Sequence, residues 1–192
     1  MTLPDPATLV LGFTLILLAL IVGFVVLTTY NDVVALANRI ETAWSNIDVA
    51  LKQRHDQLPA VVDAVRGVLA FERDTLVEVT RRRAEYAPSA PIAQQAATSE
   101  ATTAAVRSLF AVVERYPELR STTNVLELQA GIERLEDTIA ARRELYNDQV
   151  FRYNTRIGQF PGVIVATLFG WTMRPFFRAE PWDRNVPASA LP

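Results

Sequence analysis

The chain has 192 residues, half of them hydrophobic, and its 19 basic and 21 acidic side chains leave a formal net charge of -2. This length and apolar content suit one domain with a buried core plus a membrane segment, whereas two soluble domains would be crowded. The balanced charge argues against nucleic acid as a partner, and the absence of cysteine excludes disulfides, thiol catalysis and thiolate metal sites.

The first predicted element is a membrane helix over about residues 8–29, within an N-terminal segment of residues 1–29. No charged residue lies between Asp5 and Asp32, and the run from Leu9 to Leu27 is almost entirely apolar. As a helix this run spans roughly 28 Å, close to the thickness of a bilayer's hydrocarbon core. The alternative is a cleaved signal peptide, but the chain start lacks the basic residues and the cleavage site of such a peptide. We therefore expect an uncleaved anchor, with membrane lipid as a partner.

The basic residues nearest this anchor all follow it. Arg39 is the closest, and Lys52 and Arg54 come next. Cytoplasmic flanks of membrane helices are enriched in Lys and Arg, so this asymmetry favours a single-pass topology with the N-terminus outside and the domain in the cytoplasm.

Residues 30–58 are predicted to form the first helix of a bundle. Their apolar side chains recur at steps of three and four, which is typical of a bundle or coiled-coil helix. No helix breaker separates this helix from the anchor, so we expect the two to be continuous. Pro59 is expected to end or bend the helix, since proline lacks an amide hydrogen and clashes with the preceding turn. The apolar positions are Val33, Ala37, Ile40, Trp44, Ile47, Leu51 and Leu58.

Three further helices are predicted at 59–86, 94–116 and 124–160, separated by the proline-containing linker 87–93 and by Pro117. No strand alternation occurs in this part of the chain, and the connections are short. The expected fold is therefore all-α: a transmembrane helix continuous with an antiparallel up-down-up-down four-helix bundle spanning residues 30–160. In this topology the last helix returns towards the membrane.

The remaining segment, residues 161–192, is predicted to be an irregular apolar and aromatic tail that starts near the membrane and ends in a proline-rich terminus. Aromatic and apolar side chains beside arginine are typical of a segment at a membrane interface. Packing against the bundle or against a neighbouring protomer is an equally open alternative. The candidate contacts are Phe169, Trp171, Arg174, Phe176, Phe177, Arg178 and Trp182.

Three ordered motifs resemble the bacterial LemA family. They are ANRIETAWSNIDV at 37–49, ERYPEL at 114–119 and YNTRIGQFP at 153–161, and the resemblance covers roughly residues 29–178. It implies an N-terminal membrane helix, an antiparallel four-helix domain and an envelope-associated role. Genes of this family often lie beside genes for membrane proteases or membrane-repeat proteins. It supplies no catalytic residues.

The sequence offers little material for a catalytic or metal site. His55 is the only histidine, so paired-histidine zinc sites and the Glu-x-x-His pairs of di-iron bundles cannot form. The glycines form no phosphate-binding loop. We expect no catalytic residue, no metal and no cofactor, and a carboxylate-metal enzyme is the least favoured alternative.

Four charged residues occupy positions where the apolar pattern is interrupted, and two asparagines flank tyrosines of the last predicted helix. A buried charge is costly unless it is paired, so we hypothesise an internal polar network that fixes the register of the helices. The alternative is that these residues lie at the edge of the bundle, open to water. They are Arg54, Glu72, Arg83, Arg142, Asn147 and Asn154.

The leading interpretation is a non-enzymatic scaffold in the cytoplasmic (inner) membrane of a bacterium. Its long helices and aromatic tail suit lateral self-assembly into a homo-oligomer. The alternative interpretation is an adaptor for a membrane protease or another complex of the cell envelope.

Overall fold

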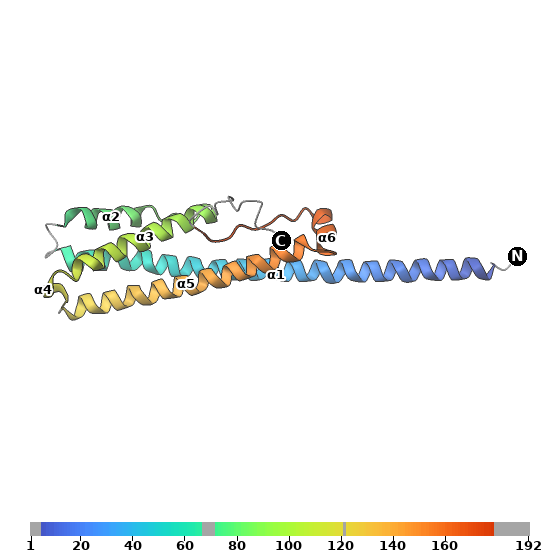
Figure 1. The fold of residues 1–192 in the computed structure, drawn as a ribbon, viewed down its shortest axis with the longest axis horizontal. Coiled ribbons are helices and arrows are strands. Elements are labelled where there is room, and N and C mark those ends of the chain that lie inside the picture. The colour runs from blue at the N-terminus through green and yellow to red at the C-terminus, as the bar shows by residue number, and fades with distance from the viewer. Residues whose placement is uncertain (1–4, 67–71, 121, 179–192) are drawn as a thin grey trace, which may run out of the picture. The chain divides into compact units, whose positions relative to one another are not determined.

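The computed structural model describes residues 5–66, 72–120 and 122–178, and these ranges contain helices and no strand (Figure 1). The predicted all-α class is therefore confirmed. The helices are α1 (Pro6–Arg66), α2 (Arg73–Ala84), α3 (Ile92–Val113), α4 (Pro117–Arg120), α5 (Thr123–Gly158) and α6 (Gly162–Phe169).

The chain divides into two compact units. The anchor unit comprises Met1–Thr42 and Asp148–Arg174, and the bundle unit comprises Ala43–Asn147 and Pro175–Pro192. Helices α1 and α5 each contribute residues to both units.

Helix α1 joins the apolar N-terminal segment to the first bundle helix without a break, as the sequence predicts. The predicted end at Pro59 is wrong, because α1 continues through this proline to Arg66. A proline inside a helix costs about 3 kcal/mol. The turn that follows buries Val61, Val62 and Val65, and each buried valine contributes about 1.5–3 kcal/mol, which together outweigh that cost.

The predicted second helix, 59–86, is divided: residues 59–66 belong to α1, residues 67–71 lie outside the described residues, and α2 covers Arg73–Ala84. Helices α3 and α5 lie close to the predicted ranges 94–116 and 124–160.

In the bundle unit, α1, α2, α3 and α5 alternate in direction (Figure 1), and their buried side chains form one apolar core. Each of α1, α2, α3 and α5 contributes side chains to it, so no helix is peripheral to the packing. Fully buried members are Leu58, Val65, Val79, Leu109 and Ile132.

In the anchor unit, the large apolar side chains from Leu9 to Leu27 are exposed, apart from the partly buried Val25 and Val26. By length and composition, α1 is the one helix among the described residues that could cross a membrane. The same unit contains the end of α5 and a short helix, α6, which corrects the prediction that the tail is irregular throughout.

Two glycines set the path of α6. Gly162 is buried at the start of this helix, where a Cβ atom would collide with the carbonyl oxygen of Arg156. Gly170 ends the helix in the left-handed region at φ 69°, which glycine adopts without strain. Residues 171–178 then continue without helix.

Candidate functional site

The most buried charged side chain in the described part of the bundle unit is Arg54, which is only 4% exposed. Its Nη1 atom donates to Glu136 Oε1 at 2.8 Å and to Thr103 Oγ1 at 2.9 Å, and its Nη2 atom donates to Ser99 Oγ at 3.0 Å. The Thr103 hydroxyl also lies 2.6 Å from Glu136 Oε2. Helices α1, α3 and α5 are thus joined by one charge-assisted cluster, which we call the Arg54 cluster.

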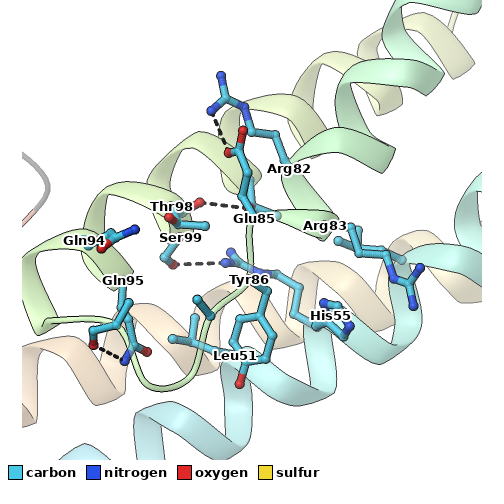
Figure 2. A pocket seen from close by; sticks show the side chains of 15 residues that line it. Leu51, His55, Arg82, Arg83, Glu85, Tyr86, Gln94, Gln95, Thr98 and Ser99 are labelled. Carbon is cyan, nitrogen blue, oxygen red and sulfur yellow. Dashed lines mark hydrogen bonds and ion pairs between the residues drawn. The ribbon is translucent and has the colours of Figure 1, made fainter.

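A small cavity of about 20 Å³ adjoins the Arg54 cluster, between α1, α2 and the start of α3 (Figure 2). This volume has room for about one water molecule. Three of the lining residues also have a buried side-chain atom without a hydrogen-bond partner among the described residues: His55 Nδ1, Arg83 Nε and Gln95 Oε1.

Tyr86 closes one side of this cavity, with its ring 4.9 Å from that of His55. Its hydroxyl donates a 3.3 Å hydrogen bond to Asp48. Burial, with a smaller contribution from the Asp48 charge, raises the pKa of Tyr86 to about 12. This phenol therefore stays protonated at physiological pH.

The structure does not bring the six predicted network residues together. Arg54 pairs with Glu136, whereas Glu72 lies 3.6 Å from Arg115 at a partly exposed position. Arg83 and Arg142 are half-buried. The single network is thus replaced by the Arg54 cluster and by separate local contacts.

Asn147 and Asn154 have a role that the sequence did not reveal. Asn147 Oδ1 accepts the Phe177 amide at 2.8 Å, and its Nδ2 donates to the Phe177 carbonyl at 3.3 Å. Asn154 makes the same pair of bonds to Arg174, at 2.8 and 2.9 Å. Each asparagine therefore holds the backbone of one tail residue, as a neighbouring strand would.

Phe177 belongs to the core of the bundle unit, so for this residue the structure favours packing against the bundle over a membrane interface or a protomer contact. It is 1% exposed, and its ring lies 5.9 Å from Trp44 and under the Arg143 guanidinium at 5.0 Å. Tyr146, which is also buried, donates a 3.0 Å hydrogen bond to the Pro175 carbonyl. The end of the described tail is therefore integral to the packing.

The other aromatic residues of the tail have different surroundings. Phe169 and Trp171 stack on each other at 5.5 Å, and their rings lie 4.9 and 5.4 Å from that of Tyr30. We call Tyr30, Phe169 and Trp171 the aromatic trio. It lies in the anchor unit and remains largely at the surface.

The remaining tail candidates make weaker contacts. Arg174 lies 3.8 Å from the carboxylate of Glu41, and Arg178 stacks over the ring of Phe176 at 5.2 Å. Trp182 lies outside the described residues.

Sequence reasoning identified Arg54 as unusual but missed its partners Ser99, Thr103 and Glu136. Ser99 and Thr103 are four residues apart in α3 and so share a face. Hydroxyl side chains on the alanine-rich start of α3 could have signalled this. Within the described ranges, no three acidic, histidine or cysteine side chains are grouped so that they could hold a metal ion.

These features define an all-helical protein whose first helix combines a candidate membrane span with a bundle helix. The model of the LemA family matches residues 43–189, and the chain therefore belongs to the LemA family. This confirms the family resemblance seen in the sequence.

The relatives differ in how much of them the chain covers. Protein LemA of Metamycoplasma hominis is 26% identical across 98% of this chain and 88% of its own length. Magnetosome protein MamQ 1 of Paramagnetospirillum magneticum is 34% identical, and magnetosome protein MamQ of Magnetospirillum gryphiswaldense is 30% identical, each over 77 residues. The chain covers 28% of the length of these MamQ proteins. Neither the family description nor these names are those of an enzyme.

Proposed function

We propose that this protein is a non-enzymatic, single-pass scaffold that self-assembles laterally in the cytoplasmic membrane of a bacterium. The observation that carries the proposal is the unbroken helix α1, whose exposed apolar segment continues directly into the bundle core. A bundle attached in this way stays at the membrane surface. Confinement there raises its effective concentration, so weak contacts between copies suffice for assembly.

Candidate contacts between copies lie on the bundle unit. Large apolar side chains are exposed on α1 at Val49 and on α5 at Leu126 and Leu145, the last being 60% exposed. Single exposed apolar residues are ordinary in monomers. On a chain held at a membrane, however, they provide the contacts that lateral packing needs.

A non-enzymatic role is supported by how the buried polar groups are used. Each guanidinium nitrogen of Arg54 that donates a hydrogen bond does so to a neighbouring helix, and Glu136 is bonded to both Arg54 and Thr103. These groups join helices, and they are not arranged as a nucleophile beside a base.

Self-assembly can be tested by cross-linking in native membranes, because the chain contains no cysteine. A Leu145→Cys variant treated with a short bifunctional maleimide should give dimers and higher species. Glu144→Cys, the neighbouring exposed position on α5, is the matched control and should give few. Native mass spectrometry should then find a homo-oligomer. A monomer bound to one other protein would contradict the scaffold and favour the adaptor.

The proposed orientation places the bundle in the cytoplasm and the N-terminus outside. A Ser89→Cys variant, in the exposed loop before α3, should resist a membrane-impermeant maleimide in intact spheroplasts and react after lysis. Asp5→Cys should react in both. The reverse pattern would overturn the orientation and leave the scaffold itself intact.

A further inference from the structure

Helix α6 is apolar on all sides and yet half of it is exposed. Its buried face consists of Gly162, Val165 and Ala166. Thr167 is its only polar residue, and the Thr167 hydroxyl bonds to the carbonyl of Val163 at 2.8 Å. A helix that is hydrophobic all round normally lies in a protein core or in lipid. The exposed apolar residues of α6 and its flanks are Phe160, Val163, Ile164, Leu168, Phe169 and Met173.

The chain around α6 is also free of charge. From Ile157 to Met173 there is no acidic or basic residue, and Arg156 and Arg174 bound this stretch. Exposed helices in water ordinarily carry charged residues on their outer face. The uncharged stretch therefore indicates an environment less polar than water.

The aromatic trio places α6 at a definite level along α1 within the anchor unit. Tyr30 contacts Phe169 and Trp171, and it follows Leu27, the end of the apolar run, by less than one helical turn. Tyrosine and tryptophan are enriched where a membrane helix leaves the hydrocarbon.

Charged residues begin immediately beyond that level. Asp32 is the first acidic residue of α1 after the apolar run, and it pairs with Arg156 at 2.9 Å. Going along α1, the neighbours thus change from apolar to aromatic to charged, as they do across a membrane interface.

We propose that α6 is a second membrane contact, which lays its exposed apolar face on the same bilayer that α1 crosses. This inference rests on the membrane anchor of the proposed function, and it commits to lipid as the occupant of that face. Insertion is shallow, because α6 is only eight residues long and its other face is buried against the anchor unit. Two contacts prevent α1 from rotating freely in the bilayer.

The test uses single-cysteine variants of the full chain, reconstituted in nanodiscs of phosphatidylcholine and phosphatidylglycerol with one copy per disc. Ile164→Cys and Leu168→Cys replace exposed side chains, so neither change disturbs the core. Each is labelled with a fluorophore that responds to lipid-borne nitroxide quenchers at several depths. Leu145→Cys is the control for a position in water, and Gly12→Cys is the control for the span.

A shallow nitroxide lipid should quench both α6 labels several-fold more than it quenches the Leu145 label. The quenching of the α6 labels should nevertheless be weaker than the quenching of the Gly12 label by a deep nitroxide lipid. If Gly12 is quenched deeply but both α6 labels behave like Leu145, the α6 inference is overturned and the anchor stands. If Gly12 is not quenched either, the anchor itself fails. Protection of the α6 labels only in discs holding two copies would identify a second protomer as the occupant and would also overturn the proposal.

Discussion

A phenylalanine of the tail is buried in the bundle unit, whereas another phenylalanine of the same tail is exposed in the anchor unit. In the bundle unit, Phe177 is 1% exposed and lies beside Trp44 and Arg143, whereas in the anchor unit Phe169 is 47% exposed. Composition cannot separate the two, because both belong to one apolar, arginine-flanked tail. The difference teaches that the tail has two parts: one completes a core, and the other supplies a surface.

The two asparagines extend this comparison. Asn147 and Asn154 make the same pair of backbone hydrogen bonds, but the bonds of Asn147 are partly buried and those of Asn154 are exposed. A hydrogen bond shielded from water stabilises the fold more than an exposed one, because water cannot bind its donor and acceptor when the bond breaks. The hydrogen bonds of Asn147 should therefore contribute more to the free energy of unfolding than the same bonds of Asn154.

The largest expected effect is that of Phe177→Ala. Removing a buried phenylalanine side chain costs about 3–5 kcal/mol of unfolding free energy, through lost burial and the cavity left behind. Phe169→Ala, the matched change at the surface, should cost less than about 0.5 kcal/mol in detergent. Thermal unfolding followed by far-ultraviolet circular dichroism measures both. Equal shifts in midpoint would show that the tail is not divided as described.

The next effect is that of Arg54→Met. Its loss leaves the carboxylate of Glu136 without its ion-pair partner, and we expect a cost of about 3 kcal/mol, the low end for a broken buried pair because Glu136 is partly exposed. Adding Glu136→Leu should restore most of the lost stability, since the unpaired charge is then gone. Glu72→Leu is the control for an ion pair near the surface, with an expected change under about 1 kcal/mol. A larger loss for Glu72→Leu than for Arg54→Met would contradict the assignment of the buried cluster.

The two asparagines that bind the tail backbone, Asn147 and Asn154, should have the next largest effects, in that order. Asn147→Ala leaves the backbone groups of Phe177 unpaired in a partly buried position and should cost about 1–3 kcal/mol. Asn154→Ala should cost about 1 kcal/mol or less, because water can replace its bonds. Hydrogen exchange of the Phe177 and Arg174 amides provides a local readout, and each variant should deprotect only its own partner. Simultaneous loss at both amides would show that the tail detaches as a whole.

Much of the fold follows from local pattern. The three-four periodicity from Val33 to Leu58 and the prolines after α2 and α3 located the helices, because buried stripes and missing amide hydrogens act within a few residues. The end of α1 could not be predicted in this way, because it depends on tertiary packing. Whether the turn after Pro59 stays helical depends on how well Val61, Val62 and Val65 are buried, and that is a property of the packed bundle.

The candidate site was predictable only in part. Arg54 stood out because it interrupts an apolar pattern, and Asn147 and Asn154 because they flank tyrosines of the last helix, but none of their partners could be chosen from sequence. Glu136 lies 82 positions from Arg54, and the backbone of Phe177 carries no side-chain signal at all. Long-range pairing is decided by topology, which periodicity does not encode.

The smallest expected effect is on the ionisation of Tyr86, which reports how strongly the bundle unit excludes water from the cavity beside the Arg54 cluster. Burial and then Asp48 raise the pKa of Tyr86 to about 12, above its ordinary value of 10.0. Folding therefore favours the protonated phenol. Its contribution to stability is complete below pH 10 and is lost as the pH rises towards 12. In a near-ultraviolet titration of the folded protein, Tyr86→Phe should remove one phenol from the ionisation near pH 12. Asp48→Asn should advance it only in part, because burial is the larger cause. Full recovery of the ordinary value in Asp48→Asn would mean that charge, and not exclusion of water, governs this side of the cavity.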